Sequence, residues 1–411
     1  MNVFHSDSIN NISSTMKSLK TILLILGLTL SVQASYAQRV RLFETFKDSV
    51  PYRIPALAVC RDGSLIAVSD YRYCGNDIGY GAVDLHQRIS HDGGKTWGLE
   101  TLLARGTAEG NSNTFGYAYG DATIVADRQS DEVLMLCVSG KMVYFNSRRD
   151  NPNRVARFRS HDGGRTWQPA EEITDQIYGL FDQRKEGPVQ GLFFGSGKIC
   201  QSRKVKVGRY YRLYAAVLTH SGVFALYSDD FGESWKVLGD ADTSPCPKGD
   251  EPKCEELPDG SVVLSARTMG RFFNVFTFSN KKKACGTWGE PVAARAFADI
   301  KNACNGEILL VKARSSATGK RVHLLLQSVP FGPQRRNVGF FYKELSGKND
   351  AKRIGEEWHR GLQVSHELSA YSTMVQLADG RIGFLWEEGP TAYNIDYLPL
   401  SISEITGGKY R

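Results

Sequence analysis

The sequence predicts an all-β protein: a six-bladed β-propeller of four-stranded antiparallel sheets. The first observation is a repeated octet, SHDGGKTW at residues 90–97, SHDGGRTW at 160–167 and SDDFGESW at 228–235. The second is a series of short β-forming runs separated by Asp-Gly or Asn-Gly turns, with no long amphipathic helical pattern between them. A motif that returns at a nearly constant period usually dictates the whole architecture, so it outweighs any single segment.

Each octet is expected to be a hairpin turn. A strand-like segment precedes each copy, at residues 83–89, 155–159 and 223–227. Asp and Ser can bind backbone N–H groups in such a turn, and a glycine can take a positive φ. The octet lacks the alternating acidic ligands of a calcium loop, so we interpret it as a structural brace. The tryptophans that end the octets are expected to pack between strands: Trp97, Trp167 and Trp235.

Further strands fill the intervals between the octets. Turn-bounded runs occur at residues 61–69, 257–266, 305–311 and 377–386, and a degenerate fourth octet at 279–288 keeps only the ending GTW. Roughly 370 residues after a predicted leader allow about 62 residues for each of six blades. The 41 glycines and the many aromatic residues (18 Tyr, 20 Phe, 6 Trp) fit tight turns between short strands. A β-sandwich is the alternative, but it would not explain the repeated octet.

Residues 1–37 are predicted to be a secretory signal peptide. Two lysines precede an apolar run at 21–32, and small residues precede a cleavage site between Ala37 and Gln38. The run is short for a membrane span, although an uncleaved anchor is the alternative, and Met16 is a possible true start. The mature protein, residues 38–411, is then one domain without a membrane span, secreted or periplasmic in a bacterium. No separate carbohydrate-binding module is evident, and we expect a monomer.

Charge and cysteine content exclude several classes of function. Loss of the leader lowers the formal net charge from +7 to +6, which favours anionic ligands only mildly and fits a generic solubility charge equally well. The basic residues form no dense run, so we predict no nucleic-acid partner. Disulfides are possible after export, and Cys246 with Cys254 would close a small loop, but the pairing stays open. No paired CxxC spacing is present, so neither a metal site nor a cofactor is predicted.

A second set of motifs occurs once each. Tyr52-Arg53-Ile54-Pro55 opens the domain and resembles the Arg-Ile-Pro motif of bacterial exo-sialidases, whose Asp boxes the octets also resemble. The other matching residues follow in the family's order: Arg72, Asp77, Glu251, Arg267, Arg335, Tyr371 and Glu387. The resemblance covers nearly all of residues 40–405. It implies a glycoside hydrolase that releases terminal α-linked sialic acid from glycoproteins, glycolipids or oligosaccharides.

The resemblance assigns the arginines to the acidic group of the substrate. Sialic acid carries a carboxylate on its anomeric carbon, and the planar fork of arginine binds carboxylates bidentately. Arg53, Arg267 and Arg335 would form this triad, and Glu387 would hold the first of them. Arg336 is an alternative to Arg335, although the spacing Arg-x-Asn fits the family better with Arg335.

The nucleophile is expected to be a tyrosine. A carboxylate nucleophile would be repelled by the carboxylate of the substrate, and sialidases are an exception to the two-carboxylate rule of glycosidases for this reason. The resemblance implies Tyr371 as the nucleophile and Glu251 as the base that activates it. Glu255 and Glu256 are rivals for the base, but Glu251 has the expected distance from Leu257.

The remaining candidates concern the leaving group and the pocket. Asp77, in a glycine-flanked loop, would protonate the leaving oxygen and then activate water. Arg72 is expected to contact the sugar, and Asp121 is a weaker candidate for a pocket residue. These roles imply a retaining reaction through a tyrosyl intermediate. The alternatives are a trans-sialidase, an intramolecular trans-sialidase, an enzyme for a related nonulosonic acid, a sialic-acid-binding lectin, or a propeller that serves only for interaction.

Overall fold

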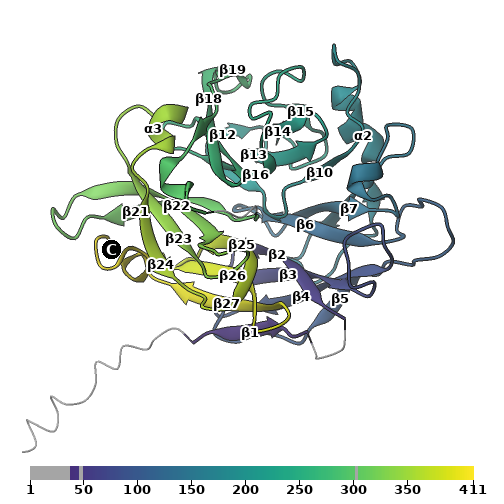
Figure 1. Cartoon of the computed structure of the whole chain (residues 1–411), viewed down its shortest axis with the longest axis horizontal. Helices are drawn as coiled ribbons and strands as arrows, with labels where there is room; N and C mark the ends of the chain where they lie inside the picture. The colour runs from purple at the N-terminus through teal and green to yellow at the C-terminus, as the bar shows by residue number, and fades with distance from the viewer. Residues whose placement is uncertain (1–37, 46–49, 301–303) are drawn as a thin grey trace, which may run out of the picture. The chain divides into compact units, whose positions relative to one another are not determined.

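Six antiparallel sheets follow one another along the chain as the blades of a β-propeller (Figure 1). The computed structural model describes residues 38–45, 50–300 and 304–411. The predicted fold class is confirmed. The predicted signal peptide lies outside the described residues and stays a prediction.

The first three blades occupy the first half of the propeller. Blade one contains β2 (Tyr52–Val59), β3 (Leu65–Arg72), β4 (Val83–Ser90) and β5 (Thr101–Ala104). Blade two contains β6 (Tyr119–Ala126), β7 (Val133–Ser139), β8 (Arg154–Ser160) and β9 (Glu171–Glu172), with β11 (Gly197–Lys198) parallel to β6. Blade three contains β10 (Leu192–Phe194), β13 (Tyr210–Thr219), β14 (Gly222–Ser228) and β15 (Lys236–Val237), with β12 (Cys200–Val207) also paired to β13.

The other three blades complete the ring. Blade four contains β16 (Asp250–Glu256), β17 (Val262–Thr268), β18 (Gly270–Asn280) and β19 (Cys285–Trp288), with β20 (Val292–Ala293) paired to β18. Blade five contains β21 (Ile308–Arg314), β22 (Arg321–Pro330), β23 (Val338–Leu345) and β24 (His359–Gln363). Blade six contains β25 (Leu368–Gln376), β26 (Ile382–Gly389), β27 (Asn394–Leu400) and β1 (Val40–Phe43). The helices are short: η1 (Tyr144–Asn146), α2 (Thr174–Tyr178), η2 (Gly179–Phe181), η3 (Arg295–Phe297), α3 (Ala351–Gly355) and α4 (Ile402–Thr406).

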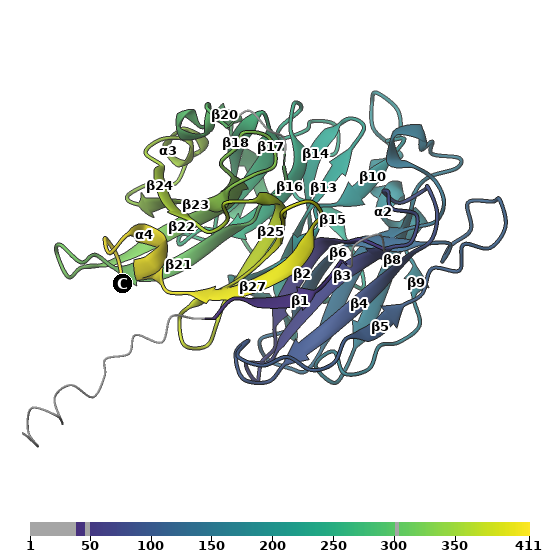
Figure 2. The same ribbon diagram turned by 60° about the horizontal axis from the view of Figure 1, so that its bottom comes forward.

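The sixth blade combines strands from both ends of the described chain. β1 pairs antiparallel with β27, with Val40 opposite Tyr397, and Figure 2 shows the two strands side by side. The inner strand β2 of blade one also contacts β25 of blade six. The ring is therefore closed by main-chain hydrogen bonds, which protect a sheet edge that would otherwise be open.

The hydrophobic core is divided among the spaces between blades. Each of the six largest clusters among the described residues joins the facing sheets of two neighbouring blades. Between blades six and one, for example, Leu57 and Leu65 pack with Leu385 and Ile395, all with no exposed surface. Full burial of such a side chain contributes about 1.5–3 kcal/mol, so each blade depends on both neighbours for its stability.

The three octets are turns tied by their own side chains, as predicted. In the first, Asp92 accepts hydrogen bonds from the backbone N–H groups of Lys95 (3.0 Å) and Thr96 (2.9 Å). It also accepts bonds from the hydroxyls of Thr96 (2.6 Å) and Ser90 (2.9 Å), and Ser90 Oγ in turn accepts the N–H of Gly94. The other two octets repeat the pattern around Asp162 and Asp230.

The glycine at the fifth position of each octet packs against the preceding blade. A Cβ on Gly164, where φ is 83°, would lie 2.4 Å from Cδ1 of Ile66 in β3. Gly94 and Gly232 stand in the same relation to side chains of the blade before them, Tyr397 and Leu134 respectively. Each octet is therefore a brace within one blade and a contact between two.

The octet tryptophans pack between strands to different depths, and the degenerate fourth copy is not a turn of the same kind. Trp235 is buried, whereas Trp97 and Trp167 are half-buried against the neighbouring clusters. The copy at 279–288 is not an Asp-tied turn, because it contains no aspartate and its ending GTW lies within strand β19.

The cysteines form no disulfide bonds. All eight are free, and Cys246 and Cys254 are both buried in the cluster between blades three and four. Among the described residues, no helix has the length and apolar character that a membrane crossing requires.

Candidate active site

A β-bulge near the start of the inner strand occurs in four blades, at the ends opposite the octets. The pairing register shifts between Arg53 and Ala56 in β2, and corresponding shifts occur in β6 (120–123), β16 (250–253) and β25 (369–372). A bulge adds a residue to one strand and re-aims its side chain. Three of the displaced residues have positive φ without being glycine: Ile54 (57°), Asp121 (56°) and Glu251 (23°). Such backbone conformations are strained and concentrate at functional sites.

These bulges surround a cavity of about 680 Å³. The lining includes eight of the nine predicted site residues: Arg53, Arg72, Asp77, Asp121, Glu251, Arg267, Arg335 and Tyr371. The ninth, Glu387, lies behind the wall with no exposed surface. The structure therefore brings together residues that the sequence separates by more than 300 positions.

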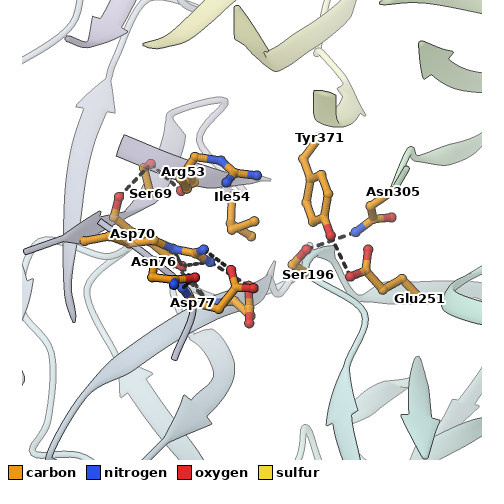
Figure 3. Close-up of polar contacts among 12 residues, drawn as sticks. Arg53, Ile54, Ser69, Asp70, Asn76, Asp77, Ser196, Glu251, Asn305 and Tyr371 are labelled. Atoms are coloured by element: carbon orange, nitrogen blue, oxygen red, sulfur yellow. Dashed lines mark hydrogen bonds and ion pairs between the residues drawn. The ribbon is translucent and has the colours of Figure 1, made fainter. Parts of the chain in front are cut away.

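Tyr371 is the centre of the cluster. Its hydroxyl donates a hydrogen bond to Glu251 Oε1 at 2.6 Å (Figure 3). The same hydroxyl accepts a hydrogen bond from Arg267 Nη1 at 2.9 Å. The guanidinium carbons of Arg335 and Arg53 lie 5.4 Å and 5.8 Å from the centre of its ring. All three predicted triad arginines thus contact the tyrosine.

Burial controls the ionisation of this pair. It raises the pKa of the Tyr371 hydroxyl well above 10, and the neighbouring Glu251 carboxylate raises it further. Burial also raises the pKa of Glu251, whereas Arg267 and the hydrogen bond from Tyr371 lower it. The tyrosine is therefore protonated at rest and can react only if its proton moves to the glutamate as it attacks.

Glu387 connects two segments of the site. Its Oε1 accepts a hydrogen bond from Nε of Arg53 at 2.6 Å and one from the backbone N–H of Ile54 at 2.9 Å. Its Oε2 accepts the backbone N–H of Tyr371 at 3.0 Å. A buried carboxylate with partners on both oxygens fixes Arg53 relative to the tyrosine and balances one cationic charge.

The two adjacent arginines of blade five have different places. Arg335 lines the cavity, and its carbonyl accepts the backbone N–H of Ser369 at 2.9 Å. Arg336 forms an isolated β-bridge with Leu368 and is not part of the cavity lining. The structure thus favours Arg335 over Arg336 as the arginine that meets a ligand.

A second cluster forms around Arg72, whose side chain is almost completely buried. Its guanidinium binds Asp70 (2.9 Å), Asp121 (3.2 Å) and Asp77. Burial raises the pKa of both Asp70 and Asp121, although Arg72 opposes the rise. Arg72 lines the cavity, so its expected contact with the sugar stays a prediction. In this structure its guanidinium also positions Asp77.

Asp77 differs from the other candidates in its exposure. Its side chain is 72% exposed and lies on the loop between β3 and β4, whereas the side chain of Glu251 is 10% exposed. Figure 3 shows the group around Asp77 and the pair of Tyr371 and Glu251 on separate sides of the site. A solvated acid opposite a buried nucleophile allows proton transfer to the outward-facing part of a ligand.

Three residues of the site were missed by the sequence reasoning. Asp250 binds Arg267 at 2.7 Å, Asp70 binds Arg72, and the ring of Tyr393 lies 4.9 Å from the guanidinium of Arg53. The positions of the two aspartates in the sequence could have identified them. Asp70 precedes Arg72 by two positions and so shares its strand face, and Asp250 adjoins Glu251 at the bulge.

The rivals for the base lie away from the tyrosine. Glu255 binds Lys198 and Arg203, and Glu256 accepts hydrogen bonds from Ser202 and the backbone of Arg203. Both side chains are buried at the other end of β16. Glu251 is the carboxylate of this strand that reaches Tyr371.

No metal cluster accompanies the site. Over residues 38–45, 50–300 and 304–411, no three His, Cys, Asp or Glu side chains are grouped so that they could hold a metal ion. The charged groups of the cavity instead pair carboxylates with arginines.

The chain matches the model of the BNR repeat-like domain over residues 67–384. The chain belongs to the BNR-repeat sialidase family. It is 29% identical to a sialidase of Micromonospora viridifaciens over 82% of this chain and 50% of that protein. It is 25% identical to a sialidase of Bacteroides fragilis over 83% of this chain and 60% of that protein. This sialidase-family chain therefore spans about half to two thirds of the length of these relatives.

Solved structures agree on the fold of this sialidase-family protein. A Hadza microbial sialidase superposes with a TM-score of 0.68 at 21% identity, over 90% of this chain and 69% of the other. The intramolecular trans-sialidase of Ruminococcus gnavus superposes with a TM-score of 0.66 at 17% identity, over 87% of this chain and 96% of the other. At these identities the likeness shows the shared propeller and no more.

Proposed function

We propose that the protein is a retaining exo-sialidase that hydrolyses terminal α-linked sialic acid from glycans through a tyrosyl intermediate. One observation carries the proposal: the Tyr371 hydroxyl lies between the carboxylate of Glu251 and the guanidinium of Arg267 in a cavity that three further arginines line. The sialidase names of the curated relatives support the same activity.

Recognition begins with the substrate carboxylate. Three arginines around one tyrosine make the cavity positive at the point where that carboxylate has to lie, and their planar forks suit its two oxygens. Because a neutral phenol carries no charge, it can approach the anomeric carbon beside the carboxylate without repulsion. The cationic site and the neutral nucleophile are thus two consequences of one acidic substrate.

The first displacement joins the sugar to the tyrosine. The phenol oxygen of Tyr371 bonds to the anomeric carbon while its proton passes to Glu251, and the glycosidic C–O bond breaks as Asp77 protonates the leaving oxygen. Arg267, 2.9 Å from the phenol oxygen, stabilises the negative charge that develops there.

The second displacement reverses these transfers. Asp77, now a carboxylate, takes a proton from a water that attacks the anomeric carbon. The bond from carbon to the phenol oxygen breaks, and Glu251 returns its proton to the tyrosine. Two inversions at one carbon retain its configuration.

The test follows the products of 3′- and 6′-sialyllactose by NMR with the purified protein. Release of sialic acid whose first-formed anomer is α supports retaining hydrolysis, and the Tyr371→Phe variant is the inactive control. First-formed β anomer would overturn the retaining course. An intramolecular transfer product would overturn hydrolysis, and absence of any release would overturn the activity.

A further inference from the structure

Glu251, Lys253 and Glu255 stand at every second position of β16 and form a charged ladder. Lys253 and Glu255 share one face of the strand because side chains alternate along it, and the bulge between Asp250 and Lys253 re-aims Glu251 into the cavity just before them. The partners of all three come from other inner strands or from residues next to them: Tyr371 of β25, Glu307 just before β21, and Lys198 of β11. Glu251, the base of the proposed reaction, is thus the first of three charged residues, and the other two lie beyond the cavity lining.

Lys253 is the middle residue of the three, and its ammonium is buried beside a carboxylate without forming a hydrogen bond to any described residue. Its side chain is 1% exposed, and its Nζ lies 3.5 Å from Oε2 of Glu307, which has no exposed surface. Within the described part of the chain, Nζ has no hydrogen-bond partner. Oε2 of Glu307 also accepts the hydroxyl of Thr373 at 3.0 Å.

The surrounding backbone makes room for this ammonium. A Cβ on Gly197, where φ is 111°, would lie 2.7 Å from Nζ of Lys253 and 3.1 Å from Oε2 of Glu307. A glycine is thus required where β11 passes the ion pair. Buried pairs of this kind add little net stability and often lose nothing when apolar residues replace them, so stability does not account for the cluster.

We propose that Lys253 is a positioning residue for the nucleophile and its base. Its ammonium holds Glu251 in the ionised state that receives the tyrosine proton, and Glu307 sets how much of that charge reaches Glu251. The inference rests on the proposed function of Tyr371 and Glu251. The Cα atoms of residues two positions apart in a chain lie at most about 7 Å apart, whether or not the strand is bulged, and at this separation a unit charge can act through a buried site.

Several charges act on Glu251 besides Lys253. Arg267 of β17 faces it and lowers its pKa, whereas Asp250 of the same strand and Asp121 of β6 raise it. Tyr371 of β25 donates a hydrogen bond to it, which also lowers the pKa. Burial raises the pKa more than any of these groups does, so an additional cation nearby favours the ionised form.

The charges that face Lys253 come from three more elements. Burial lowers the pKa of its ammonium, and Glu307 opposes this most strongly. Lys198 of β11 and Arg271 of β18 lower the pKa further, whereas Glu251 raises it. Glu307 and Glu251 thus both favour the charged form of Lys253, against burial and the neighbouring cations.

The experiment measures kcat/KM against pH for three variants: Lys253→Met, Glu307→Gln and the double variant. Activity needs ionised Glu251, so the acid limb of the profile reports the pKa of that group. Loss of the cation should move this limb to higher pH by roughly one to two units. Loss of the Glu307 charge should move it to lower pH, and the neutral double variant should return close to wild type.

An acid limb that Lys253→Met leaves in place, or that both single variants move in the same direction, overturns the inference. A structural role alone would lower stability in both variants without shifting the limb in opposite directions. If Lys253→Met does not fold, the pH profile of Glu307→Gln tests the inference alone. An acid limb at the wild-type position in that variant overturns the inference. Near-wild-type turnover of Tyr371→Phe would instead overturn the proposed function, which keeps the two failures distinguishable.

Discussion

The two ends of the blades are built by different kinds of contact. At the octet ends, Asp92 binds Thr96 four positions away, and the same local bonds recur in three blades. At the cavity ends, Arg53 binds Glu387 across 334 positions and Tyr371 binds Glu251 across 120. The octets are repeated and local, whereas the site is unrepeated and assembled by ring closure. Changes at one end should therefore leave the function of the other largely intact.

The largest expected effect is on catalysis. Tyr371→Phe should lower kcat for an aryl sialoside by at least about a thousandfold, because the nucleophile is removed. Thermal unfolding should stay within a few degrees of wild type, since the ring keeps its packing and loses one hydroxyl. Turnover near that of wild type would contradict the mechanism.

A smaller effect on binding separates the two neighbouring arginines. Arg335→Ala should raise KM by about ten- to a hundredfold, the usual effect of losing a hydrogen bond to a charged group. Arg336→Ala is the matched control and should leave KM unchanged, because that side chain is outside the cavity lining. Steady-state kinetics on both variants would check this, and the reverse ranking would reassign the third arginine.

At the octet ends the expected effect is on stability. Gly164→Ala should destabilise the protein by roughly 2–4 kcal/mol, because it combines a strained φ with overpacking against the preceding blade. Gly163→Ala is the control: it shares the positive φ of 74°, but its Cβ would meet only Arg165 Nη1 at 3.8 Å. Denaturant unfolding should give Gly164→Ala a much lower free energy of unfolding than Gly163→Ala. The kcat/KM of both variants should stay near that of wild type. Equal losses would show that no contact between blades is involved.

The smallest effect concerns acid stability. Burial by itself would raise the pKa of the Asp92 carboxyl. Hydrogen bonds from Thr96, Ser90 and Lys95 outweigh burial and lower this pKa to about 2. Because the folded pKa lies below the unfolded value of 3.8, the stabilisation is complete above about pH 4 and is lost as the pH falls toward 2. Urea unfolding of wild type and Asp92→Asn should therefore differ at pH 6 and converge near pH 2. A difference that does not depend on pH would exclude ionisation of Asp92 as the cause.

Part of the site could be predicted from the sequence because certain residues sit in motifs of fixed spacing. Tyr371, Glu251 and Arg53 were identified through such motifs, and the structure places all three around one cavity. The support for them could not be predicted in the same way. Tyr393 has no motif, and Lys253 stands in a strand where alternation alone gives no partner. Their roles depend on which strands the closed ring brings to the centre.

The sequence by itself determined the architecture of this protein, since three tied turns and regularly spaced short strands allow few other folds. It also determined which residue types were available for an acidic sugar. Only the tertiary structure decided which arginine of the pair Arg335 and Arg336 faces the cavity, which glutamate of β16 meets the tyrosine, and that Arg72 is held by three carboxylates. The physical reason is that turns are formed by neighbours in the chain, whereas the pKa and orientation of a buried group depend on the charges that folding places around it.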